Sequence, residues 1–202
     1  SSGALVTTTS AGAVVTYHPV THEMTEHATD LQELYGVAMA PNGTIVVAEG
    51  GAGRVLQIDR AGVRVMARGL ARPTGIASAG DGSCYVCEAG AGRVVQVNGG
   101  VNTVLEGLRD PQGLLRVSHE LFVIDADAHE LVGYSLRTKQ RETIASNLPV
   151  GAPPGVTPKT LMGIAGLLPG PLRPFAGLAS ASDGTIFLSA DGDGSVLALR
   201  RT

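Results

Sequence analysis

The sequence predicts an all-β fold, specifically a β-propeller of four-stranded antiparallel blades. The first observation is a repeat. Val46–Ile58 reads VVAEGGAGRVLQI and Tyr85–Val97 reads YVCEAGAGRVVQV, with an acid, glycines and an arginine at the same spacing. The second is a series of short apolar runs separated by Asn-Gly and Asp-Gly pairs, which favour tight hairpin turns. The third is the content of 28 glycines, about twice the usual share. Four short strands repeated every ~40 residues are typical of propeller blades.

Copies of this repeat follow one another along the chain. Gly36–Asp59 aligns with Gly75–Asn98 without a gap, Gly113–Leu136 has one residue fewer before its second strand, and Gly177–Arg200 is the last copy. A partial copy, Ala4–Pro19, lacks the first strand. A helical repeat is excluded because the apolar pattern within each copy has a period of two. The residues predicted at the position of the acid are Thr8, Glu49, Glu88, Asp125 and Ala190.

Each complete copy predicts four strands in order. In residues 36–70 the first strand, GVAMA, ends in the turn PNGT. The second strand, TIVVA, is apolar throughout, as expected when neighbouring blades cover both of its faces. After a loop with glycines comes the third strand, RVLQI, and then a more polar fourth strand, VRVMARGL. Pro73, Pro111 and Pro174 stand just before three of the first strands, where a missing N–H costs little.

The copies define the expected domain organisation. We expect one domain over residues 1–202, with a partial blade at 4–31, complete blades at 32–70, 71–108 and 109–147, an insertion loop at 148–174 and a last blade at 175–202. The first copy lacks its first strand and the last lacks its fourth. This favours an N-terminally incomplete chain, with about five blades of a six-bladed propeller, because an open arc leaves strand edges unpaired. A five-bladed ring, or closure of the ring by a second chain, remain alternatives.

Composition excludes some classes of partner. The formal net charge is −3, so no basic field exists to attract nucleic acid. No apolar run approaches the ~20 residues of a membrane span, and the longest, Leu161–Leu172, is broken by Gly and Pro. Cys84 and Cys87 lie three apart in one predicted strand, so their side chains face opposite sides and we expect buried free thiols. Cytoplasmic and exported locations both stay open.

The segment Arg72–Val97 (RPTGIASAGDGSCYVCEAGAGRVVQV) follows the pattern P-x-G-[IV]-A, D-G, V-[AC]-[DE] and then R-V. It resembles the NHL-repeat family, within the wider six-bladed group of gluconolactonase-like and strictosidine-synthase-like proteins. His129 stands just before a third strand, as in many NHL units. The resemblance covers nearly the whole chain except the insertion. It implies the architecture well and the function poorly, because propellers of this kind have many roles.

Two features of the predicted blades converge on one rim. Glu49, Glu88 and Asp125 lie at the ends of second strands, and the insertion 148–174 connects a fourth strand to the next first strand. In a four-stranded antiparallel blade these two kinds of connection share a rim, to which Asp127 and Asp191 also belong. The sequence therefore predicts a binding platform for a protein or small-molecule ligand on this carboxylate rim, partly covered by the insertion.

An alternative is a hydrolase or lyase. The resemblance to gluconolactonase-like enzymes implies a divalent cation at such a rim, for example Ca or Zn, with Glu49, Glu88 and Asp125 as candidate ligands, because hard cations prefer oxygen ligands. His129 is the candidate acid–base group. The competing structural interpretation is that the acid belongs to the repeat itself. It would then accept hydrogen bonds from backbone N–H groups of its loop, or pair with Arg54 and Arg93.

Overall fold

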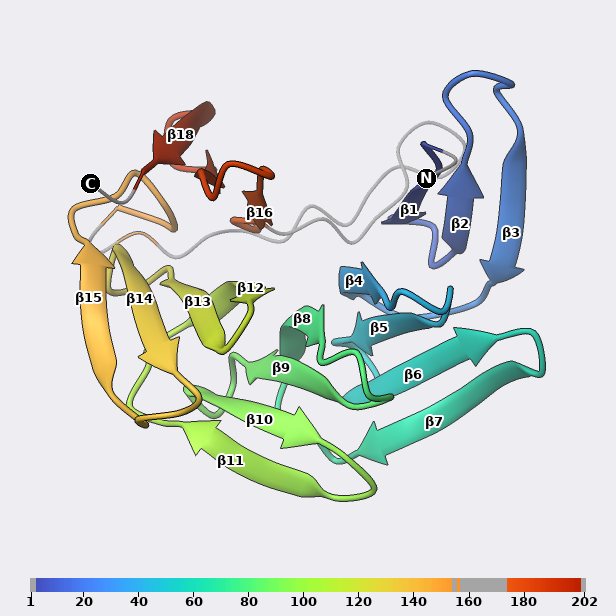
Figure 1. Ribbon diagram of the computed structural model, residues 1–202, viewed down its shortest axis with the longest axis horizontal. Coiled ribbons are helices and arrows are strands. Elements are labelled where there is room, and N and C mark those ends of the chain that lie inside the picture. The colour runs from blue at the N-terminus through green and yellow to red at the C-terminus, as the bar shows by residue number, and fades with distance from the viewer. Residues whose placement is uncertain (1–2, 154–155, 157–173, 201–202) are drawn as a thin grey trace.

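The chain forms five antiparallel sheets arranged as a β-propeller, which confirms the predicted fold class (Figure 1). The computed structural model describes residues 3–153, 156 and 174–200. Within these residues every regular element is a strand, and no helix has the length and apolar character that crossing a membrane requires.

The sheets follow the order of the repeats. Sheet 1 contains β1 (Leu5–Thr8), β2 (Val14–Tyr17) and β3 (Met24–Ala28). Sheet 2 contains β4 (Leu34–Met39), β5 (Ile45–Glu49), β6 (Arg54–Asp59) and β7 (Gly62–Arg68). Sheet 3 contains β8 (Pro73–Ser78), β9 (Cys84–Glu88), β10 (Arg93–Val97) and β11 (Val101–Leu105). Sheet 4 contains β12 (Pro111–Val117), β13 (Glu120–Asp125), β14 (Glu130–Ser135) and β15 (Arg141–Ala145). Sheet 5 contains β16 (Leu178–Ser180), β17 (Ile186–Ala190) and β18 (Ser195–Leu199).

The first strands of sheets 2 to 5 line the centre of the arc. Strands β4, β8, β12 and β16 are neighbours in that order, and the later strands of each sheet lie progressively further out (Figure 1). Gly36, Gly75 and Gly113 bring these inner strands close together, because a Cβ at each would lie 2.1–2.6 Å from a backbone oxygen of the next sheet. Sheets 1 and 5 are the two ends of the arc.

The register of sheet 1 corrects one predicted equivalence. Thr8 pairs with Val14, whereas in sheet 2 the residue that pairs with the matching Val55 is Ala48, one position before the acid. The equivalent of the acid is therefore Thr9, not Thr8. The cause is the loop before β2, which is one residue shorter than the loops that follow β5 and β9. The predicted hairpin turns are confirmed at Gly43, Gly82 and Gly184, which have φ angles of 83°, 89° and 83°.

Branched aliphatic side chains fill the spaces between sheets. The apolar cluster between sheets 2 and 3 includes Cys84, and the cluster between sheets 3 and 4 includes Cys87. The two sulfurs thus lie on opposite faces of β9, and both are buried free thiols, as the odd spacing predicts. Burial raises the pKa of the Cys84 thiol to about 12 and raises the pKa of Cys87 further.

This burial predicts that the native thiols are unreactive. At pH 8 a thiol with a pKa near 12 carries about a thousandfold less thiolate than an exposed cysteine, and the thiolate is the nucleophile. We expect both cysteines to react with Ellman's reagent promptly in guanidinium chloride but only at the rate of unfolding in buffer. Rapid reaction of either thiol in the folded protein would contradict the buried placement.

Candidate functional site

A buried glutamate holds each of two connections between sheets. The Oε1 of Glu88 accepts a hydrogen bond from the N–H of Ala71 at 2.8 Å, and its Oε2 accepts one from the Nε of Arg93 at 2.6 Å. Both carboxylate oxygens are thereby occupied. The carboxylate ties the chain that arrives from sheet 2 to the end of β9. The equivalent residues one sheet earlier are Glu49, Gln32 and Arg54.

The ion pair between Glu49 and Arg54 also changes the pKa of the arginine. The hydrogen bond to Glu49 raises the pKa of the Arg54 guanidinium above its ordinary value. Glu49 and Glu88 are each 1% exposed, and burial of a charge at this depth requires the partners that both have. The geometry of both glutamates agrees with the interpretation that the repeated acid is a structural part of the repeat.

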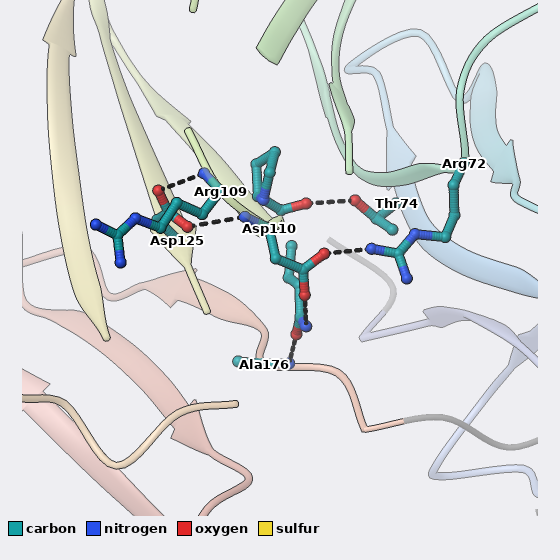
Figure 2. Close-up of polar contacts among 8 residues, drawn as sticks. Arg72, Thr74, Arg109, Asp110, Asp125 and Ala176 are labelled. Carbon is teal, nitrogen blue, oxygen red and sulfur yellow. Dashed lines mark hydrogen bonds and ion pairs between the residues drawn. The ribbon is translucent and has the colours of Figure 1, made fainter. Parts of the chain in front are cut away.

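Asp125 holds the equivalent connection, between sheets 3 and 4, but the position that corresponds to the arginine differs. Position 130, which corresponds to Arg54 and Arg93, is a glutamate. The shorter Asp125 side chain instead accepts two backbone hydrogen bonds, from the N–H groups of Arg109 and Asp110, both at 2.9 Å (Figure 2). The connection from sheet 3 is therefore held at two successive residues.

Sheet 5 explains why the acid is missing at Ala190. The residue of the connection that should donate its N–H is Pro149, which has none. Pro149 is placed by its carbonyl, which accepts a hydrogen bond from the N–H of Gly192 at 2.9 Å. The carboxylate has moved one residue along the chain: Asp191 accepts a hydrogen bond from the N–H of Gly151 at 2.9 Å.

The other predicted residues of the carboxylate rim lie in the loop between β13 and β14. Asp127 is exposed and His129 is half-buried. His129 has a φ of 56° and occupies the loop position that Gly53 and Gly92 take in the preceding sheets. The carbonyl of His129 accepts a hydrogen bond from the N–H of Leu148 at 3.0 Å. The carbonyls of Gly53 and Gly92 accept the equivalent hydrogen bonds, so this backbone contact recurs from sheet to sheet. Of the insertion, residues 154–155 and 157–173 lie outside the described residues.

The structure brings together a second set of polar residues, which the sequence did not single out. Arg72, just before β8, forms an ion pair with Asp110, just before β12 (Figure 2). The Nε2 of Gln112 donates to Asp110 at 2.8 Å, and the Oε1 of Gln112 accepts the N–H of Ala176 at 2.9 Å. The hydroxyl of Thr74 donates to the carbonyl of Pro111 at 2.8 Å. These contacts link sheets 3, 4 and 5.

An aromatic contact extends this set to sheet 2. The ring of Phe175, the neighbour of Ala176, lies 5.8 Å from the ring of Tyr35 on β4, measured between centroids. We call Tyr35, Arg72, Asp110, Gln112 and Phe175 the inner-rim residues. They lie at the start of the innermost strands, on the same side of the propeller as the carboxylates that hold the connections.

The inner-rim residues differ from sheet to sheet where the surrounding backbone repeats. Register places Glu33, Arg72 and Asp110 at one equivalent position, and Tyr35, Thr74, Gln112 and Ala176 at another. A position that maintains the fold keeps its residue type, as the acids at 49, 88 and 125 do. A ligand does not in general have the pseudo-symmetry of the propeller. Residue types that differ among equivalent positions therefore indicate a binding site, and this signal was already present in the sequence.

The charged pair of the inner rim is accessible. The side chain of Arg72 is 40% exposed and that of Asp110 is 15% exposed, in contrast to the buried acids behind them. Within the part of the chain that the structure describes, no three His, Cys, Asp or Glu side chains are grouped so as to hold a metal ion. The oxygens of Glu49, Glu88 and Asp125 already have hydrogen-bond donors, so they do not fit a cation site and we derive no step through a metal.

Comparison with known proteins identifies the fold. No known protein-family profile and no curated protein sequence matches the chain. A streptogramin B lyase structure matches all of this chain at 12% identity with a TM-score of 0.68, and the chain spans 66% of that protein's length. A chain of a nidogen–laminin complex matches 97% of this chain at 16% identity and a TM-score of 0.67, over 88% of its own length. A protein designated a gluconolactonase matches 96% at 16% identity and a TM-score of 0.62, over 75% of its length.

Proposed function

We propose that this chain is an NHL-like β-propeller that acts as a binding platform through its carboxylate rim. The rim carries Glu49, Glu88, Asp125, Asp127, Asp191 and the connection 148–174. The first three acids hold the backbone, and the inner-rim residues contact the ligand. The observation that supports this division most is the Arg72–Asp110 ion pair. It is accessible, it joins two sheets, and it stands at a register where each sheet carries a different residue.

The inner-rim residues favour a ligand with charged groups of both signs and an aromatic ring. The planar guanidinium of Arg72 suits a carboxylate, which it binds through two parallel N–H donors. Both oxygens of Asp110 accept a hydrogen bond, from Arg72 and from Gln112. Asp110 differs from the buried acids because its side chain is 15% exposed, and a carboxylate has lone pairs for a further donor such as an ammonium group. The Tyr35–Phe175 pair offers ring faces and edges for stacking. A peptide terminus next to an aromatic side chain has this chemistry. Similar folds occur both in a lyase and in a protein–protein complex, so the fold accommodates small and large ligands.

The proposal is tested with the dipeptides Gly-Phe and Phe-Gly as probes, and with acetyl-phenylalanine amide as an uncharged probe. We expect both dipeptides to shift amide resonances of Arg72, Asp110 and Gln112 in heteronuclear NMR spectra. Arg72→Gln should weaken binding about tenfold or more, because a hydrogen bond to a charged group contributes about 1.5–3 kcal/mol. The uncharged probe should bind more weakly than either dipeptide.

A matched variant controls for general effects of removing an arginine. Arg64→Gln removes a guanidinium whose Nη2 contacts Gln57 on the outer part of sheet 2, away from the inner rim. It should leave dipeptide binding unchanged. Resonance shifts that spread over outer strands, or equal binding by the Arg72→Gln variant, would refute the proposed site.

The hydrolase or lyase alternative shares the fold but has less support from the described side chains. It needs a cation held by the carboxylate rim, and the acids assigned to that role each have two hydrogen-bond donors. His129 stays a candidate acid–base group, and its placement is explained by the positive φ of its loop position. We therefore propose binding as the function of the rim.

A further inference from the structure

The side-chain amide of Gln112 has only one orientation that satisfies both of its contacts. Its Nε2 donates to Oδ2 of Asp110 at 2.8 Å, and its Oε1 accepts the N–H of Ala176 at 2.9 Å. A carboxylate only accepts hydrogen bonds and a backbone N–H only donates them, so the reversed amide would set oxygen against oxygen and N–H against N–H. Gln112 is 9% exposed, and buried polar groups without partners are costly. The two partners therefore fix the orientation of Gln112 together.

Gln112 is the middle of a chain of hydrogen bonds that begins at the accessible ion pair. Arg72 donates to Oδ1 of Asp110 and Gln112 donates to Oδ2, so the carboxylate is held from two sides. The chain continues through the amide of Gln112 to Ala176 (Figure 2). Successive hydrogen bonds of matching polarity polarise and strengthen one another in a buried environment. A change at Arg72 should therefore alter the hydrogen bond of Ala176.

The far end of this chain lies next to an aromatic ring. The N–H of Ala176 belongs to the peptide group that joins Ala176 to Phe175, so its hydrogen bond restricts the backbone beside Phe175. The Phe175 ring lies 5.8 Å from the Tyr35 ring between centroids, at an interplanar angle of 37°. Gln112 therefore stands between the charged half and the aromatic half of the inner rim.

Comparison with Thr74 separates this role from that of a simple tie between sheets. Thr74 stands at the equivalent position of sheet 3 and donates to the carbonyl of Pro111, on the inner strand of the next sheet. A short side chain with one hydrogen bond is therefore enough to tie two neighbouring inner strands. Gln112 makes the corresponding contact to sheet 5 and adds a second contact, to the carboxylate of the ion pair. A structural tie alone does not require this second contact.

We propose that Gln112 is a positioning residue that couples the Arg72–Asp110 ion pair to the placement of Phe175. This inference rests on the proposed function for its consequence, which is that the charged and aromatic parts of one ligand bind cooperatively. A ligand group that binds Arg72 or Asp110 changes the hydrogen bonds of the Asp110 carboxylate, and Gln112 transmits that change to the backbone at Phe175. The coupling itself is a property of the ligand-free chain.

The first test therefore uses the full chain without ligand. Arg72→Ala removes the donor at one end of the chain of hydrogen bonds, in a side chain that is 40% exposed. We expect the amide of Ala176 to exchange its hydrogen at least about tenfold faster, relative to the amides of β13. In a Gln112→Met background, which keeps the length of the side chain and removes its amide, Arg72→Ala should have no further effect on Ala176.

Two matched variants control for the loss of an arginine and for the loss of a tie. Arg64→Ala removes a guanidinium from the outer part of sheet 2, and Thr74→Val removes the equivalent hydrogen bond between inner strands. Neither should change the exchange rate at Ala176. Unchanged exchange in Arg72→Ala, or an equal acceleration in Thr74→Val, would overturn the coupling. The Arg72→Ala measurement decides this even where Gln112→Met does not fold.

A second test measures the consequence with the dipeptide Phe-Gly. Arg72→Ala and Phe175→Leu should weaken its binding non-additively, by a factor of at least about three, and this factor should disappear in the Gln112→Met background. Additive losses without the Gln112 substitution would overturn cooperative binding. If Phe-Gly does not bind while exchange at Ala176 responds to Arg72→Ala, the coupling stands and the proposed class of ligand is wrong.

Discussion

Replacing Gly75 by alanine is expected to destabilise the propeller by about 3 kcal/mol, the upper end of the range of about 1–3 kcal/mol that is typical of overpacking with backbone shifts. A Cβ at this position would lie 2.1 Å from the carbonyl oxygen of Gln112 and 2.7 Å from the N–H nitrogen of Leu114. Both atoms belong to the backbone of β12, so no side-chain rotation relieves the clash. The inner strands of sheets 3 and 4 would have to separate.

Gly177→Ala is the matched control. Gly177 stands at the equivalent position of sheet 5, but the nearest atoms to its Cβ would be a side-chain oxygen of Ser189 at 3.5 Å and a ring carbon of Phe175 at 4.0 Å. We expect a change within about 0.5 kcal/mol. Urea denaturation followed by circular dichroism measures both variants. Equal stability of the Gly75 and Gly177 variants would show that the inner strands are not packed as closely as the structure has them.

Glu88→Ala is the second large effect that we expect, a loss of about 3 kcal/mol. The variant removes the acceptor of a charge-assisted hydrogen bond from Arg93 and leaves the N–H of Ala71 without its partner. The loss should act on the connection between sheets 2 and 3, because this carboxylate joins them. Glu88→Gln retains an acceptor for the N–H and should lose about half as much.

Glu106→Ala serves as the control for loss of charge. Glu106 is exposed in the connection that follows β11, so its removal should change stability by less than about 0.5 kcal/mol. The three variants are compared in urea with a common denaturant slope. If Glu88→Ala were as stable as Glu106→Ala, the acid would have no structural role, and a direct role in ligand contact would become the better explanation for its repetition.

The sequence predicted those parts of the molecule that depend on local residue pattern. Alternation of apolar residues and the Asn-Gly and Asp-Gly turns gave the strands, and the odd spacing of Cys84 and Cys87 gave their opposite faces. One predicted equivalence, at Thr8, was wrong. The loop before β2 is one residue shorter than in the other copies, and a repeat alignment does not detect this difference when the flanking residues are similar. Pairing of Thr8 with Val14 is what reveals it.

The contacts of the inner rim could not be predicted from the repeat, because they join distant residues. Arg72 and Asp110 are 38 positions apart, and Ala176 and Gln112 are 64 apart. Their meeting depends on how closely the inner strands pack, which is set by Gly75 and Gly113. Alignment of the copies favours what is constant among them, and the residues at this rim are those that differ.

The connection between sheets 4 and 5 is anchored in a way that should tolerate changes in its sequence and length. Its two ends are fixed separately, Gly151 by the carboxylate of Asp191 and Ala176 by the amide of Gln112. Neither anchor uses a residue between them. We therefore expect that sequence between Gly151 and Phe175 can be exchanged, lengthened or shortened while sheets 4 and 5 keep their positions, as long as Phe175 keeps its contact with Tyr35. Substitutions in this connection could change ligand recognition during evolution with little loss of stability. The same connection is a site where a chosen loop could be grafted without redesign of the propeller.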